Sequence, residues 1–219
     1  MNRFPLKEQI IDSVLTGITT AQSNYNSWIA HELYLSYAPA KFLSIHVAQE
    51  IAKIRDLPEI FIDASIEDIL KSSLAKRDDY RKFMSKNNIS QDLISITLDE
   101  RFEHQNDEDC VSRAIITLRN GVKTAKKEYK QDIDLLCKLL SKQQKQDSTL
   151  DYGIFGFYLD ISNTSKIKAA KRIEQIINSF DNIVDSHKNL KSNFKGGDIH
   201  KIKNIGEWCV GCYIIEPIV

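Results

Sequence analysis

The sequence has little glycine, proline or cysteine and no excess charge of either sign. Its 219 residues include 8 Gly, 4 Pro and 4 Cys, and 30 Lys and Arg balance 30 Asp and Glu. A net charge of zero produces no overall field that would attract DNA or an acidic membrane, although it is compatible with a local basic patch. Four scattered cysteines are too few for a disulfide scaffold in a chain of this length.

Long apolar segments and common catalytic motifs are also missing. No run approaches the roughly 20 apolar residues that cross a bilayer, and Lys7 and Glu8 interrupt the stretch that a signal peptide would need. We therefore expect a cytoplasmic protein without membrane contact. The sequence contains no phosphate loop, no dinucleotide fingerprint, and no nucleophile paired in a recognisable pattern with any of its 5 histidines.

The remaining composition is that of a folded globular protein. Hydrophobic residues make up 42% of the chain and charged residues 27%. We see no repeat, low-complexity tract or linker that would divide the chain. We therefore expect a single domain over residues 1–219, in which a helical region at 1–37 packs on an α/β core at 38–219.

Hydrophobic periodicity predicts an α/β fold with a mixed central sheet flanked by helices. Apolar residues at helical spacing predict helices over residues 6–22, 38–53, 65–87 (one helix or two), 123–142 and 165–188. Apolar runs and alternation predict strands within 58–64, 92–98, 110–118, 152–159 and 208–215. We expect a helix break at 24–27, an irregular acidic segment at 99–109 and a loop at 196–197.

The segment Ile-Ile-Thr-Leu-Arg-Asn-Gly-Val at residues 115–122 is the most specific feature. Its apolar run is typical of a central strand that is buried on both faces. Asn120 and Gly121 favour a turn, and an amphipathic helix follows. Alternation along the strand places Thr117 and Arg119 on the same face.

This segment resembles the core of the PD-(D/E)XK nuclease superfamily, in which the strand carries a glutamate and, two residues later, a lysine. The resemblance implies a restriction-endonuclease-like core. In that family the glutamate and an upstream acid bind Mg²⁺, and the lysine orients the attacking water. Here Thr117 stands at the glutamate position and Arg119 at the lysine position. A neutral hydroxyl is a poor Mg²⁺ ligand, whereas arginine keeps a charge that pairs with phosphate or carboxylate.

The resemblance also suggests where an upstream acid would lie. Asp99 and Glu103 are the candidates, because Arg101-Phe102-Glu103 is similar to an Arg-x-Asp found there in some of these nucleases. In the second helix, Ala40 stands where a related group often has a glutamate. We therefore interpret Glu103, Thr117 and Arg119 as positions of a vestigial catalytic site.

The function that the resemblance implies is a degenerate nuclease that acts as a binding or regulatory module, in bacterial defence or nucleic-acid transactions, without a cofactor. One alternative is an active Mg²⁺-dependent nuclease with a migrated site. In it Asp99 and Glu103, together with Asp107 or Asp109, supply the carboxylates that hold the metal, and Arg119 takes the role of the lysine. Another is a structural interaction subunit of an unrelated α/β fold, since a short apolar run before Asn-Gly also occurs in ordinary core strands.

Basic residues follow the motif closely. Arg119, Lys123, Lys126, Lys127 and Lys130 are predicted to contact phosphate, and more lysines lie between residues 188 and 203. The alternative is a solvated charged face, because acids are mixed in. The predicted partner is a nucleic acid or a protein, and a homodimer is compatible with the sequence.

Cys209 and Cys212 form a Cys-x-x-Cys pattern within a predicted strand. Residues three apart on a strand face opposite sides, so we expect these cysteines to pack rather than to bind metal or form a redox pair.

Overall fold

The computed structural model describes residues 4–30, 33–55, 58–89, 93–104, 107–142 and 145–218, without the side chains of 77, 101–104, 107–110 and 145. One seven-stranded sheet runs through the molecule in the order β1-β2-β3-β4-β7-β5, with β6 also paired to β7. Its strands are β1 (Glu59–Ser65), β2 (Leu93–His104), β3 (Asp107–Arg119), β4 (Tyr152–Ser162), β5 (Leu190–Gly196), β6 (His200–Ile202) and β7 (Gly206–Pro217).

The sheet is mixed. β3 and β4 run parallel, and the other pairs are antiparallel. This confirms the predicted α/β class with a mixed central sheet. The parallel pair has a consequence for function, because the helices that follow β3 and β4 both begin toward the same end of the sheet.

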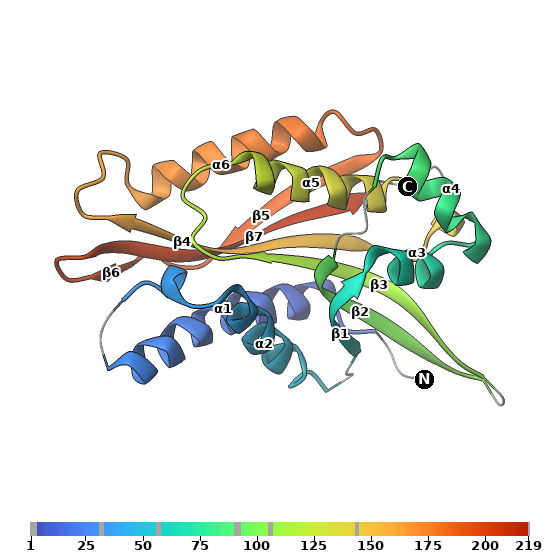
Figure 1. Ribbon diagram of the computed structural model, residues 1–219, viewed down its shortest axis with the longest axis horizontal. Helices are drawn as coiled ribbons and strands as arrows, with labels where there is room; N and C mark the ends of the chain where they lie inside the picture. The colour runs from blue at the N-terminus through green and yellow to red at the C-terminus, as the bar shows by residue number, and fades with distance from the viewer. Residues whose placement is uncertain are drawn as a thin grey trace.

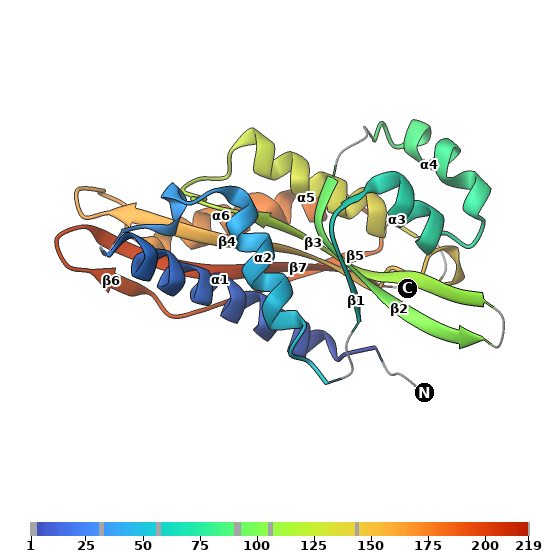
Figure 2. The ribbon, with the colours of Figure 1, turned by 60° about the horizontal axis from the view of Figure 1, so that its bottom comes forward.

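Helices cover both faces of the sheet (Figures 1 and 2). One face carries α1 (Lys7–Ile29) and α2 (Ala40–Ile51), and the other carries α3 (Ile66–Ser73), α4 (Tyr80–Lys86), α5 (Lys127–Leu140) and α6 (Ala169–Val184). Short 3-10 turns occur at η1 (Leu35–Tyr37), η2 (Arg77–Asp79) and η3 (Lys145–Asp147). Among the described segments, no helix is both long enough and apolar enough to cross a membrane.

The central position of β3 follows from its apolar run. Ile116 and Leu118 join the core beneath α1 and α2, whereas Ile115 joins the core beneath α5 and α6. The sequence predicted a strand buried on both faces, and the structure confirms it. The turn after β3 is also confirmed: Gly121 has a φ of 68°, and the Asn120 amide donates to the carbonyls of Leu35 (2.8 Å) and Ala38 (3.3 Å).

Three local predictions were wrong. Helix α1 continues through residues 24–27, where side chains make tertiary contacts: Asn24 Nδ2 lies 2.9 Å from His46 Nε2, and Asn26 Oδ1 accepts from the Leu33 N–H at 3.2 Å. Residues 99–104 and 107–109 are not irregular. They extend β2 and β3 into a long hairpin that projects beyond the helices (Figure 2), because each strand supplies the other's backbone hydrogen bonds.

The third wrong prediction concerns the C-terminal part of the sheet. Strands β5 and β6 were not predicted, and the expected loop at 196–197 begins at the last residue of β5. β5 alternates weakly between polar and apolar residues. It is held by pairing with the strongly apolar β7, as the register Phe194–Tyr213 and Ser192–Ile215 illustrates. Tertiary pairing therefore overrode weak local propensity.

Candidate functional site

Thr117 and Arg119 line a groove of about 440 Å³ between the start of β2, the end of β3 and α5. Both residues lie on the same face of β3, as the alternation predicts. Residues 127–140 form α5 because Tyr129, Ile133 and Leu136 make a buried apolar stripe. The groove is lined by Asn88, Ile89, Leu93, Ile94, Ser95, Thr117, Arg119, Glu128, Gln131, Asp132, Asp134, Leu135 and Lys138.

A bidentate ion pair fixes Arg119 in this groove. Its Nε lies 2.6 Å from Asp132 Oδ2 and its Nη2 lies 2.7 Å from Asp132 Oδ1. The hydrogen bonds to Asp132 raise the pKa of the Arg119 guanidinium, so the group stays charged. Paired donors in this fork geometry hold a carboxylate more rigidly than a lysine would. The pair therefore sets the direction of Arg119 and also occupies the carboxylate of Asp132.

Two hydroxyl groups face the groove next to this ion pair. Thr117 is only 7% exposed, and its hydroxyl forms no hydrogen bond with any residue that the structure describes. Ser95 lies across from it on β2, where its Oγ accepts the Leu118 N–H at 3.0 Å. The part of the strand at which the sequence resemblance predicts a carboxylate position therefore presents neutral hydroxyls.

The acids predicted as metal ligands lie elsewhere. Asp99 pairs with Ser112 and Glu103 pairs with Glu108 on β3. Ser112 is five residues from Thr117, or about 16 Å along the strand, and Glu108 is nine residues away, or about 30 Å. The side chain of Glu103 lies outside the described part of the chain. The structure therefore does not bring Asp99 or Glu103 beside Thr117.

Asp99 occupies a buried position under α3. It is 6% exposed, and its Oδ1 has no hydrogen-bond partner among the described residues. Burial raises the pKa of the Asp99 carboxyl, the nearby Glu59 raises it further, and the hydroxyl of Ser112 partly opposes this change. The Oγ of Ser112 in turn lies 2.5 Å from the Oγ of Ser72 on α3.

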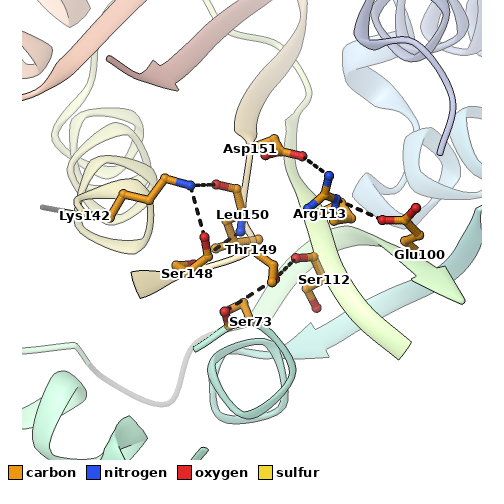
Figure 3. A network of polar contacts seen from close by, with 9 residues as sticks. All are labelled: Ser73, Glu100, Ser112, Arg113, Lys142, Ser148, Thr149, Leu150 and Asp151. Carbon is orange, nitrogen blue, oxygen red and sulfur yellow. Dashed lines mark hydrogen bonds and ion pairs between the residues drawn. The ribbon is translucent and has the colours of Figure 1, made fainter. Parts of the chain in front are cut away.

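A polar network continues from Ser112 to the start of β4 (Figure 3). The hydroxyl of Thr149 donates to the Ser112 carbonyl at 2.7 Å, and the amine of Lys142 donates to two carbonyls of the same segment at 3.1 Å each. Arg113 lies between Glu100 (3.3 Å) and Asp151 (3.0 Å). These contacts join β3, α3 and β4, so we interpret them as structural.

The donor set around the groove does not fit Mg²⁺. Asp132 is bound by Arg119, and Asp134 is bound by Lys138 (2.8 Å) and His187 (3.0 Å). Within the described ranges, no three His, Cys, Asp or Glu side chains are arranged to hold a metal ion. A divalent cation of this kind needs several oxygen ligands with carboxylates among them, and the hydroxyl of Thr117 supplies no charge.

The predicted phosphate-contacting residues divide into two groups. Lys126, Lys127 and Lys130 are exposed at the beginning of α5, and we call these three the α5 lysines. Arg119 and Lys123 are instead engaged within the protein. The amine of Lys123 lies 2.7 Å from Oδ2 of Asp160, which is fully buried at the end of β4.

The second predicted basic run does not form one patch. Lys191 pairs with Glu216 at 3.2 Å, and Lys195 pairs with Asp12 at 2.6 Å, both on the edge of the sheet around β5. Lys201 and Lys203 lie at the β6–β7 hairpin.

Cys209 and Cys212 are buried and belong to the cores on opposite faces of the sheet. This confirms the prediction that they cannot point at one another.

Sequence reasoning missed the importance of Ser95 and did not pair Asp132 with Arg119. In a strand over residues 92–98, alternation alone puts Ser95 on the face opposite Ile94 and Ile96, but only the pairing of β2 with β3 brings Ser95 next to Thr117. Asp132 is five residues beyond the start of α5, and only the packing of α5 on β3 turns it toward Arg119.

A scan against protein-family models, a search of curated proteins and a search of solved structures each returned no match.

Proposed function

We propose that this protein is a nucleic-acid-binding module that does not cut its ligand, acting in defence or nucleic-acid transactions as its resemblance to degenerate nucleases implies. The observation that carries the proposal is the set of α5 lysines at the carboxyl end of β3, next to the groove with Thr117 and Arg119. In open α/β sheets, ligands bind in the crevices outside the carboxyl ends of the strands.

The charges at this end support phosphate contacts. The α5 lysines are exposed, and no side chain among the described residues caps the first turn of α5, so its backbone N–H groups and positive dipole end face potential ligands. The start of α6 lies toward the same end of the sheet and adds Lys166 and Lys168, both exposed (Figure 1). A local basic surface of this kind binds phosphate even when the whole chain is neutral.

The absence of cleavage rests on the residues in the groove. Thr117 offers a neutral hydroxyl where the resemblance requires a carboxylate, and Asp132 is held by two hydrogen bonds from Arg119. Without a carboxylate to hold the metal, the metal-activated water of such nucleases has no anchor.

Binding can be tested by fluorescence anisotropy with single-stranded and double-stranded DNA and RNA at several salt concentrations. Changing the three α5 lysines to glutamate should abolish most of the affinity at moderate salt. It should also reduce the slope of log K against log salt by about 2 to 3, since each phosphate contact contributes about 0.7 to 0.9.

A matched control changes Lys76, Lys82 and Lys86 to glutamate. These lysines are also exposed, and they lie around α4 at the other end of the molecule, so the net charge changes by the same amount. Equal loss in both triple variants, or no binding by the native protein at low salt, would refute the proposal. The second result would favour a protein partner.

Nuclease assays test the other half of the proposal. Plasmid, single-stranded DNA and RNA should stay intact with Mg²⁺ or Mn²⁺. Metal-dependent cutting that disappears in Glu103→Ala would establish the alternative of an active nuclease with a migrated site.

A further inference from the structure

The groove beside Arg119 combines unused hydrogen-bond donors with an apolar wall. Arg119 donates from Nε and from one Nη2 hydrogen to Asp132. Among the described residues, its other three N–H groups, both hydrogens of Nη1 and the second of Nη2, have no partner. Thr117 is buried except on its groove side and has no partner among the described residues. Ser95 accepts from the Leu118 N–H, so its own hydroxyl hydrogen is free to donate. Three neighbouring side chains therefore offer donors to one cavity.

Next to these donors, the groove has an apolar side made by Ile89, Leu93, Ile94 and Leu135. Leu93 is 61% exposed, so its side chain presents apolar surface to solvent at the groove. A volume of about 440 Å³ lies in the range of small-ligand sites, which pair apolar walls with a few convergent polar groups.

We propose that this groove binds a nucleotide-sized phosphomonoester. The phosphate accepts hydrogen bonds from Ser95, Thr117 and Arg119, and the base packs against Ile89, Leu93 and Leu135. This is a small-molecule site, and it stands independently of nucleic-acid binding by the α5 lysines.

Charge in the groove is compatible with an anion. Asp132 is neutralised by Arg119, and Asp134 is neutralised by Lys138 with His187 beside it. Glu128 is exposed at the rim, 3.8 Å from the amine of Lys126. The anion is therefore bound by oriented donors, and the fork geometry of arginine is the one that suits phosphate.

The test is isothermal titration calorimetry of the full chain with the four common nucleoside 5′-monophosphates. Inorganic phosphate and adenosine serve as probes of the two halves of the ligand. We expect at least one nucleotide to bind more tightly than either half. Thr117→Val keeps the shape of the side chain but removes its hydroxyl, and it should weaken binding about tenfold or more, as loss of a hydrogen bond to a charged group does.

Thr16→Val is the matched control, because Thr16 is exposed on α1 on the other face of the sheet and should leave binding unchanged. Ser95→Ala serves as a second groove variant if Thr117→Val folds poorly. The triple α5 lysine variant should still bind nucleotide, which separates this site from the nucleic-acid surface. The proposal is overturned if no nucleotide binds at millimolar concentration, if both groove variants bind normally, or if inorganic phosphate binds as tightly as the nucleotides.

Discussion

We expect the ion pair between Lys123 and the buried carboxylate of Asp160 to stabilise the fold. Asp160 at the end of β4 is 0% exposed, and the amine of Lys123 lies 2.7 Å from its Oδ2. Neither oxygen of Asp160 makes a well-oriented hydrogen bond to any other described residue. Changing Lys123 to Met keeps most of the side-chain stem and removes the charge, so Asp160 would be left buried without its counter-ion.

The size of the effect follows from the burial of the two partners. Removing one member of a buried ion pair typically costs 3–5 kcal/mol, because the remaining charge has lost its water and its partner. The Lys123 side chain is 54% exposed, so solvent screens part of the attraction. We therefore expect Lys123→Met to lower the free energy of unfolding by about 3 kcal/mol, the lower end of this range. For a protein of this size, that corresponds to a fall in Tm of about 6–12 °C.

A double-mutant cycle separates the ion pair from other effects. Urea unfolding at pH 7 would be followed by circular dichroism for the native protein, Lys123→Met, Asp160→Asn and the double variant. Asp160→Asn removes the buried charge, so Lys123→Met should cost much less in that background. The reasoning would be refuted if Lys123→Met lost less than about 1 kcal/mol, or if the two changes were simply additive.

Other expected outcomes follow from burial. Phe155→Ala should lower the free energy of unfolding by about 3–5 kcal/mol in urea titrations, because Phe155 is fully buried 5.2 Å from the ring of Phe180, and an unchanged midpoint would contradict this. Because the pKa of Asp99 is raised in the folded state, the contribution of this one carboxyl to stability falls as pH rises through its unfolded value of about 4 toward its folded value. The free energy of unfolding of Asp99→Asn should therefore increase relative to that of the native protein as pH rises. A difference between the two proteins that does not change with pH would contradict this prediction. Burial raises the pKa of Cys137 and Cys209 to about 12, so iodoacetamide at pH 8 should modify them only after unfolding, as mass spectrometry of digests would show.

The sequence predicted some elements well because their signals are local. The apolar stripe of Tyr129, Ile133 and Leu136 can be recognised within a single segment of the chain, and the structure confirms the helix as α5. The apolar run of β3 and the turn at Gly121 depend on neighbouring residues alone, and both are confirmed. Strand β5 was missed because its pattern is weak and its pairing partner β7 lies far along the chain.

The candidate site shows the same division. Alternation along the strand was enough to place Thr117 and Arg119 on one face. The order of residues in the sequence was enough to place lysines at the start of the helix that follows. The assignment of Asp99 and Glu103 to the same site relied on the resemblance of a short segment to a nuclease motif. The strand register places their partners on β3 about 16 and 30 Å along the strand from Thr117.

By itself, the sequence determined the α/β class, the buried central strand and the placement of Thr117 and Arg119 on one face of that strand. Periodicity and residue type are properties of a short stretch of chain, so they can be read without knowing what lies next to it. Only the tertiary structure decided that Asp132 binds Arg119, that Ser95 lies opposite Thr117 and that Lys123 forms an ion pair with the buried Asp160. Those contacts depend on strand register and helix packing between segments 13 to 37 residues apart, and no local pattern encodes them.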